Sequence, residues 1–170
     1  PFAISVTGGT VPITLERSNG ATETLEVKIP AGIEDGKKIR LRGQGEAGPD
    51  GATAGDLIIM IHVDSHPWFQ RRGKNLHVRV PVTLAEAALG GKVEVPSPHG
   101  SVVLRLPSGT SSGAKLRVRG HGVKPAGTTP GDLYAEIQIQ LPQELTDEER
   151  EQIRQLDARH PLNPRRDLRW

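Results

Sequence analysis

One segment of the sequence occurs twice, and this repetition restricts the possible folds more than any other feature. The seventeen residues IPAGIEDGKKIRLRGQG, from Ile29 to Gly45, align with LPSGTSSGAKLRVRGHG, from Leu106 to Gly122, and eight of the seventeen positions are identical. About one identity would be expected at ordinary residue frequencies. The correspondence continues downstream, where GDLIIMIHV matches GDLYAEIQI, and upstream, where VTGGTVPI matches ALGGKVEV. The sequence therefore predicts one fold unit of about 60–80 residues that is present twice in tandem.

Each unit has the alternation of apolar and polar residues that is typical of β-strands. The segments TLEVKIP and KKIRLRG alternate with period two, and glycine, proline and asparagine bound them. The segment DLIIMIHV is mostly apolar, which predicts a strand covered on both faces. The only helix signal inside a unit is TLAEAALGG, with Thr83 as its cap and Gly90 at its end. We therefore expect a mainly all-β chain of two similar β-sandwich domains, each with one short helix at most.

The second unit indicates what the first should contain at its beginning. There the strand NLHVRVPVTL, from Asn75 to Leu84, precedes the Gly-Gly motif. Its counterpart in the first unit would end near Phe2. We therefore expect the chain to begin inside its first domain, with most of that strand placed before Pro1.

The C-terminal segment has a different pattern, that of a helix. Thr146 and Glu149 form a capping box, and acidic residues crowd the first turn, as the helix dipole favours. The apolar stripe is thin, with only Leu145, Ile153 and Leu156 on it, so the helix either packs lightly or contacts a partner chain. The predicted boundaries are residues 1–70 for the first domain, 71–142 for the second, and 143–170 for the helix with its basic tail.

Several separate motifs, in the same order, resemble the C-terminal region of DnaJ, the family of J-domain co-chaperones. They are VKIPAGIEDGKKIRLRGQG, GDLIIMIHVDSHPWFQRRGKNL, VPVTLAEAALGGKVEVPSPHG and GDLYAEIQIQLPQELTDEE, and they cover Phe2 to about Leu156. The zinc-containing class of that family inserts a module of repeated C-x-x-C-x-G-x-G motifs where this chain has a short hairpin between Leu15 and Thr24. The chain therefore resembles the zinc-free class. The J-domain and its His-Pro-Asp motif are absent.

The resemblance implies a function and a set of residues that perform it. Zinc-free relatives hold unfolded polypeptide in a shallow apolar groove of the first domain, and the matching client-binding positions here are Ile13, Leu15 and Ile59. The helix with Leu145, Ile153 and Leu156 would form a homodimer. The implied partners are unfolded or partly folded proteins and a DnaK-type chaperone, and the implied location is the cytoplasm.

The same residues disfavour other classes of function. Without cysteine there is no thiolate zinc site or disulfide framework, and we expect no cofactor or metal. Asp64, Ser65 and His66 are adjacent in sequence, unlike a catalytic triad, so we expect no enzyme. The sequence holds no apolar run of membrane-spanning length. Two alternatives stay open: a β-sandwich spacer and dimerisation module, and a nucleic-acid-binding module that uses two basic strand faces. The first face carries Lys38, Arg40 and Arg42, and the second carries Lys115, Arg117 and Arg119.

Overall fold

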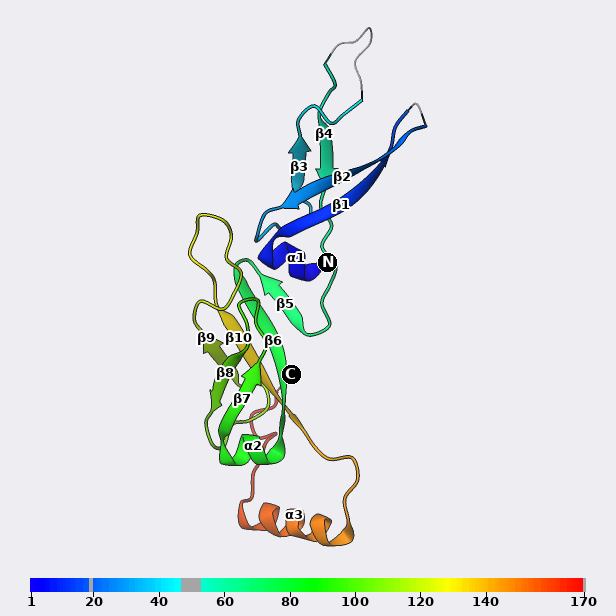
Figure 1. Cartoon of the computed structure of the whole chain (residues 1–170). Helices are drawn as coiled ribbons and strands as arrows, with labels where there is room; N and C mark the ends of the chain where they lie inside the picture. Colours follow the sequence, from blue (N-terminus) through cyan, green and yellow to red (C-terminus); the bar gives the residue numbers. More distant parts are fainter. Residues whose placement is uncertain (19, 47–52, 170) are drawn as a thin grey trace. The chain divides into compact units, whose positions relative to one another are not determined.

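The computed structural model describes residues 1–18, 20–46 and 53–169, and most of its regular structure is β-strand (Figure 1). Contacts divide the chain into a compact unit of residues 1–139 and a second unit of residues 140–170, each described by itself below. The helices are α1 (Phe2–Thr7), α2 (Leu84–Leu89) and α3 (Asp147–Arg159). The strands are β1 (Gly9–Glu16), β2 (Thr22–Ile29), β3 (Lys38–Leu41), β4 (Leu57–Met60), β5 (Phe69–Arg72), β6 (Asn75–Thr83), β7 (Gly91–Val95), β8 (Val102–Leu106), β9 (Lys115–Val118) and β10 (Leu133–Gln140).

The structure confirms the predicted fold class, including one short helix in each repeat and a helix near the C-terminal end. The order helix, hairpin, two strands occurs twice, as α1-β1-β2-β3-β4 and as α2-β7-β8-β9-β10. Of the two short helices inside the repeats, the sequence identified only α2, because α1 has no side-chain cap. The predicted domain boundaries at residues 70 and 142 stay predictions.

The Gly-Gly motif of each repeat ends the short helix with the same geometry. Gly8 and Gly90 have φ values of 76° and 78°, in the region that favours glycine. A Cβ atom on Gly8 would lie 2.8 Å from the backbone nitrogen of Ala31, and one on Gly90 would lie 2.8 Å from the nitrogen of Ser108. Glycine is therefore required here both by the backbone conformation and by the close approach of the following turn.

A second repeated motif joins an R-x-x-G segment, Arg40–Gly43 or Arg117–Gly120, to an aspartate further along the chain, Asp56 or Asp132. In the second repeat, Asp132 Oδ1 accepts a hydrogen bond from the Gly120 backbone N–H at 2.9 Å, and Oδ2 accepts one from Arg117 Nε at 2.7 Å. In the first repeat, Asp56 receives the Gly43 N–H at 2.9 Å and pairs with Arg40. The identical arginine, glycine and aspartate positions of the repeat thus close the same turn twice.

The second repeat is a sandwich around a large apolar core. One layer is the four-stranded sheet β5-β6-β10-β9, and the other is the β7-β8 hairpin. Both layers contribute to one cluster, here called the second-repeat cluster. Its thirteen buried members are Val6, Leu76, Val78, Val80, Val82, Ala87, Val95, Leu104, Leu106, Val123, Leu133, Ala135 and Ile137. Val6 comes from α1, so the first helix packs into the core of the second repeat.

The first repeat has two smaller sheets, β1-β2 and β3-β4, around a smaller core. Only Val27, Ile29 and Ile33 are buried there among the described residues. The partly buried side chains that pack against these three are Ile4, Val11, Ile13, Ile39, Leu41, Ile59 and Ile61. The three buried and seven partly buried residues together are called the first-repeat cluster.

Arg71 of β5 ties the two repeats together inside the first unit. Its guanidinium donates to the carbonyl oxygens of Ile33 at 2.6 Å, Gly32 at 2.8 Å and Gly73 at 2.7 Å, and its side chain is only 14% exposed. Ile33 belongs to the first-repeat cluster, whereas β5 belongs to the sheet of the second repeat. The charge of Arg71 therefore satisfies backbone carbonyls from both sides of the junction.

The second unit contains α3, whose predicted capping box is present. Thr146 Oγ1 accepts the Glu149 N–H at 3.3 Å, and the Thr146 N–H donates to Glu149 Oε2 at 2.8 Å. None of the helix residues is buried. The described residues include no helix that is long and apolar enough to cross a membrane.

The repeated aspartate turns predict a loss of stability in acid. The Gly120 N–H and then Arg117 lower the pKa of Asp132, and the Gly43 N–H and then Arg40 lower the pKa of Asp56, from a usual value of 3.8. The ionised carboxylates therefore stabilise the fold fully above the unfolded pKa, and this contribution disappears as the pH falls through the lowered folded values. We expect calorimetry to give an unfolding temperature that falls as the pH drops from about 5, past the usual value of 3.8, through the lowered pKa values of the folded state. The double variant Asp56→Asn with Asp132→Asn should be less stable at neutral pH and should lose less on acidification, whereas an unchanged pH profile would contradict this role.

The Arg71 contacts predict a specific stability loss. Arg71→Ala should lower the free energy of unfolding by about 2 kcal/mol, because three backbone carbonyls lose a charged donor. Arg72→Ala is the matched control, since within the described part of the chain the exposed Arg72 donates a hydrogen bond only to the nearby Gln70 side chain, and the substitution should change stability by less than about 0.5 kcal/mol. Urea unfolding monitored by circular dichroism measures both. Equal effects of the two variants would show that the Arg71 contacts do not stabilise the junction.

Candidate functional site

The two predicted positions on the strand after the first Gly-Gly motif lie on the inner face of β1. Ile13 is paired with Leu25 of β2, and Leu15 is paired with Glu23, whereas Thr14 between them is exposed on the opposite face. Successive side chains of a strand point to opposite faces, so the alternation in VPITLE makes β1 one-sided. Both Ile13 and Leu15 keep part of their surface accessible to solvent.

The structure brings the third predicted position, Ile59, to the same cluster as Ile13. Ile59 lies on β4 opposite Ile39 of β3, and it packs against the first-repeat cluster from the sheet that faces β1-β2. Ile13 and Ile59 therefore come from different sheets but contribute to one apolar surface. Leu15 lies two residues further toward the β1-β2 hairpin and remains partly exposed.

The prediction that the apolar run of β4 is covered on both faces is wrong. Ile58 is 54% exposed and Met60 is 52% exposed. One face of β4 packs toward the first-repeat cluster, and the other, which carries these two side chains, points to solvent. The sequence could not distinguish a fully covered strand from a half-covered one, because both can be written as a continuous apolar run.

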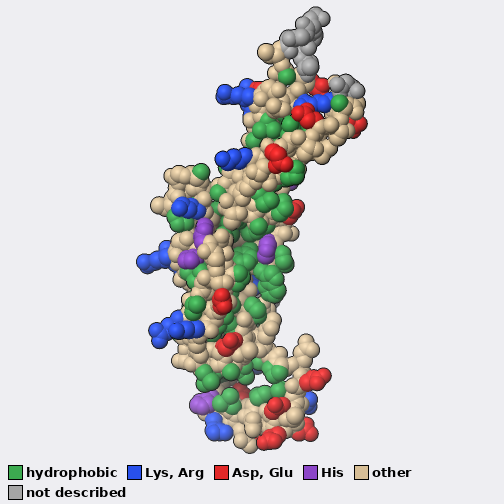
Figure 2. Space-filling model, viewed as in Figure 1, with side chains coloured by type: hydrophobic (Ala, Val, Ile, Leu, Met, Phe, Trp, Pro, Cys, Tyr) green, Lys and Arg blue, Asp and Glu red, His purple; other side chains and the backbone are tan. Residues whose placement is uncertain are grey.

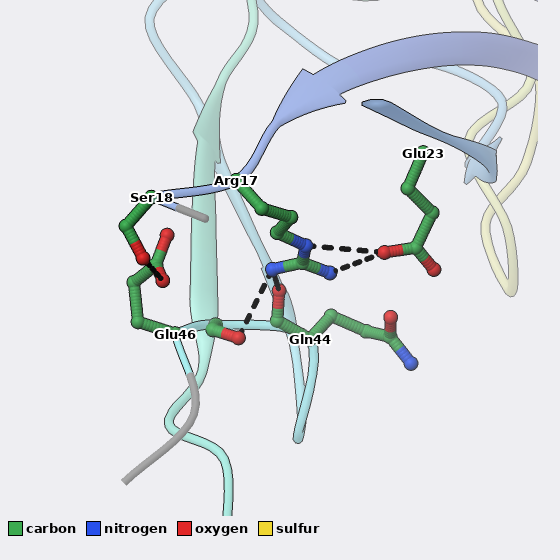
Figure 3. A network of polar contacts seen from close by, with 6 residues as sticks. Arg17, Ser18, Glu23, Gln44 and Glu46 are labelled. Atoms are coloured by element: carbon green, nitrogen blue, oxygen red, sulfur yellow. Dashed lines mark hydrogen bonds and ion pairs between the residues drawn. The ribbon is translucent and has the colours of Figure 1, made fainter. Parts of the chain in front are cut away.

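Arg17 holds the end of the β1-β2 hairpin close to the loop after β3 (Figure 3). Its Nη1 donates to the carbonyl oxygens of Gln44 at 2.9 Å and Gly45 at 3.0 Å, while Nε and Nη2 donate to Glu23 Oε2 at 3.1 and 2.7 Å. Ser18 adds a hydrogen bond to Glu46 at 2.7 Å. This network fixes the strand end that carries Leu15, and nothing in the sequence pattern around Arg17 had indicated it.

The second repeat uses a different side chain for the same tie. His99, in the β7-β8 hairpin, donates from Nε2 to the carbonyl oxygen of Gly122 at 3.0 Å. Gly122 is the counterpart of Gly45 in the repeat, so a histidine and an arginine bind the same carbonyl in the two copies. The architecture therefore demands a donor at this place, but not a particular residue type.

The two basic strand faces are partly neutralised. Arg40 and Arg117 are bound to the aspartates of their own turns, and Lys115 lies 3.9 Å from Glu136. On the visible surface the Lys and Arg side chains are spread out singly or in small groups (Figure 2). These arginines therefore close turns, which weakens the case for a continuous phosphate-binding stripe.

A stacked pair of rings lies on the outer face of the four-stranded sheet. The His77 and Tyr134 rings are 5.0 Å apart and nearly parallel, at 12°. Partial burial lowers the pKa of His77, and the nearby charges of Arg72 and Lys115 lower it further. The imidazole is therefore neutral near pH 7 and acts as a packing group.

His66, in the HPW segment, is held by backbone hydrogen bonds and by contacts with two aromatic rings. Its Nδ1 accepts the backbone N–H groups of Trp68 and Phe69, both at 3.2 Å, and its ring lies 5.3 Å from that of Phe2 and 5.2 Å from that of Phe69. His66 therefore packs α1 against the start of β5, and its Nδ1 atom already accepts two backbone hydrogen bonds. Within the described ranges, no group of three or more histidine or acidic side chains could hold a metal ion.

The predicted dimerisation residues lie at the start of α3 and along it. Leu145 precedes the Thr146 cap and is partly buried, whereas Ile153 and Leu156 are 44% and 55% exposed. Ile153 and Leu156 are three residues apart and therefore share one face of the helix. Both side chains on this face therefore keep about half of their surface accessible to solvent.

Comparison with known proteins relates the chain to chaperones. It is 50% identical over 133 residues to "Chaperone protein DnaJ 2" of Corynebacterium efficiens, which covers 78% of this chain and 33% of that protein. It is 47% identical over 150 residues to "Chaperone protein DnaJ 1" of Streptomyces coelicolor, which covers 87% of this chain and 38% of the relative. It is 45% identical over 137 residues to "Chaperone protein DnaJ" of Paraburkholderia phymatum, covering 80% and 36%.

The chain thus spans about a third of the length of these relatives. The family model described as "DnaJ C terminal domain" matches residues 1–142, which is most of the chain. Together with the duplicated β-sandwich fold, this match shows that the chain belongs to the DnaJ C-terminal domain family.

Proposed function

We propose that this chain is the polypeptide-binding part of a DnaJ-type co-chaperone, and that it binds non-native protein at the apolar surface of Ile13, Leu15 and Ile59. The observation that carries the proposal is the partly exposed inner face of β1, which lies beside a cluster with only three buried residues among those described. In the whole protein, bound clients would pass to a DnaK-type chaperone. The chain acts by binding and needs neither a catalytic group nor a cofactor.

The chemistry of non-native protein fits this surface. An unfolded segment exposes apolar side chains and unpaired backbone groups, and an apolar channel beside a strand accommodates both. Ordering the segment costs conformational entropy, so the affinity of one site is low. Two sites held together in a dimer raise the overall affinity through effective concentration.

Dimerisation through α3 forms the second part of the proposal. The face of Ile153 and Leu156, with Leu145 just before the cap, is an apolar surface that remains about half exposed to solvent. A second copy of the helix would cover that face, and two copies would place two polypeptide-binding surfaces in one assembly.

The client-binding surface predicts a face-specific mutational effect. Ile13→Asp with Leu15→Asp should abolish binding of a fluorescein-labelled apolar peptide, because two carboxylates would replace the apolar wall. Thr14→Asp is the matched control, since Thr14 lies on the same strand but faces the other way, and it should bind normally. Fluorescence anisotropy at low and high salt gives the affinities. Because Ile13 also packs against the first-repeat cluster, circular dichroism tests whether the double variant is still folded. The single variant Leu15→Asp leaves Ile13 in place and should still weaken peptide binding.

The outcomes of this experiment separate the candidate functions. Normal binding by the double variant would refute the assignment of the surface. No binding by the unmodified chain would favour the spacer and dimerisation function. Binding that collapses as salt rises would indicate a charged ligand such as nucleic acid.

The dimer predicts a change of mass in solution. Ile153→Asp with Leu156→Asp should convert a dimer to a monomer in light scattering, because charges would enter the apolar contact. Ala158→Asp adds a charge on the opposite side of α3 and should leave the dimer intact. Deletion of the residues from Glu144 onward should also give a monomer, and a dimer that survives the deletion would refute the role of the helix.

A further inference from the structure

The outer face of the four-stranded sheet β5-β6-β10-β9 brings aromatic and cationic side chains together. The other face of this sheet packs into the second-repeat cluster. Gln70 of β5 is the register partner of His77 of β6, and Tyr134 of β10 is the register partner of Arg117 of β9. Because the His77 and Tyr134 rings also stack on each other, these four side chains form one row across all four strands.

A second group of side chains lies beside this row. Arg79 is two residues beyond His77 on β6, so it points to the same face of the sheet. Lys115 of β9 and Glu136 of β10 are register partners, and Trp68, just before β5, is 54% exposed. All five side chains line one hollow of about 630 Å³, a volume in the range of pockets that hold small ligands. Their exposed surfaces therefore face the same space.

Two cations of this face have no carboxylate partner within the described part of the chain. Lys115 lies 3.9 Å from Glu136, and Arg117 is bound to the aspartate of its own turn. Arg72 of β5 donates to a neighbouring glutamine side chain, and Arg79 is exposed and forms no ion pair among the described residues. The guanidinium groups of Arg72 and Arg79 are therefore available to the anionic groups of a ligand.

Another part of the lining of the hollow is acidic. Glu34 and Asp35, which precede β3, and Asp64, which follows β4, contribute to it. These carboxylates repel an anionic ligand, whereas Arg72 and Arg79 attract it. The charge distribution therefore directs the anionic groups of a ligand to the sheet and away from the segments of the first repeat.

Single-stranded RNA has the chemistry that fits this surface. Unpaired bases stack on exposed rings, and the phosphates of the RNA backbone bind guanidinium groups. A four-stranded sheet that presents rings on its outer face is one established platform for unpaired RNA bases. The exposed amide groups of Gln70 and Gln138 can both donate and accept hydrogen bonds, which suits the 2′-hydroxyl group of RNA.

We propose that the outer face of this sheet binds single-stranded RNA, with bases stacked on Trp68 and on the His77 and Tyr134 pair. Arg72 and Arg79 bind the phosphates. The surface belongs to the second repeat and is separate from the polypeptide-binding surface proposed on the first. It gives the chain a second class of ligand, whose binding depends on salt as that of an apolar client does not.

A fluorescein-labelled oligoadenylate of about ten nucleotides is the probe, and the whole chain is used. Fluorescence anisotropy should show binding at low salt, with an affinity that falls on a double-logarithmic plot with a slope of about −1.4, because two phosphates are neutralised. Double-stranded RNA should bind at least about tenfold more weakly, since its bases are not free to stack on the protein. Single-stranded DNA of the same bases should also bind more weakly, because it lacks the 2′-hydroxyl group.

Substitutions on the outer face test the residues assigned to each contact. Trp68→Ala should weaken RNA binding about tenfold, whereas Trp68→Phe keeps a ring and should bind nearly as well as the unmodified chain. Arg79→Glu should weaken binding about tenfold and flatten the salt dependence. Arg105→Glu is the matched control, since it makes the same charge change at an exposed site on β8, in the other layer of the sandwich, and should change the affinity less than about twofold. Circular dichroism confirms that the variants are folded.

Five results would overturn the proposal. They are no RNA binding by the unmodified chain, unchanged binding by Trp68→Ala, equal losses in Arg79→Glu and Arg105→Glu, equal binding of the DNA, and displacement of the RNA by polyglutamate as readily as by unlabelled RNA. The last result would identify an acidic protein segment as the ligand.

The RNA surface and the client surface can be separated with one further variant. Ile13→Asp with Leu15→Asp, which should abolish binding of the apolar peptide, should leave RNA binding intact. A parallel loss of RNA binding in a folded double variant would contradict the assignment of RNA to the second repeat.

Discussion

The burial of β6 is the interaction on which the larger half of this structure depends. The strand is hydrogen-bonded between β5 and β10, and its four inward side chains are at most 5% exposed. Burial of four such side chains contributes about 6–12 kcal/mol, which is comparable with the whole stability of a typical domain. The first repeat has no such strand among its described residues. Two units with similar sequences therefore differ strongly in how completely their cores are covered.

The residues that recur in both repeats are those that backbone geometry requires. Gly8 and Gly90 end a short helix where the next turn leaves no space for a Cβ atom. Asp56 and Asp132 close equivalent turns by accepting a glycine N–H and pairing with an arginine. These functions need a specific residue type, which explains why the two copies remain alike there. The contact between hairpin and loop needs only a side chain that donates a hydrogen bond to a glycine carbonyl oxygen. Arg17 donates to Gly45 in one copy, and His99 donates to Gly122 in the other.

A partly covered core can stabilise a fold and bind a ligand with the same residues. Ile13 and Ile59 pack in the first-repeat cluster and also keep accessible surface, so the proposed binding surface uses residues that also stabilise the core. Arg17 and Arg71 lie at opposite ends of this region and bind backbone carbonyls, which limits how far the small sheets can separate. A shallow apolar surface on a well-anchored frame suits weak, repeated binding of many different sequences.

The sequence by itself determined the duplication, the β-rich class and the capped C-terminal helix, because these depend on local periodicity, turn residues and capping. The resemblance of its motifs located Ile13, Leu15 and Ile59 on strands of the first repeat. Tertiary structure alone decided that α1 packs into the other repeat's core, that Arg71 joins the repeats, and that Ile58 and Met60 are exposed. These facts depend on which segments become neighbours in space, and a local sequence pattern does not specify that. Among the described residues, the similar segments β4 and β10 differ in this way, since β4 has one hydrogen-bonded neighbour in its sheet and β10 has two.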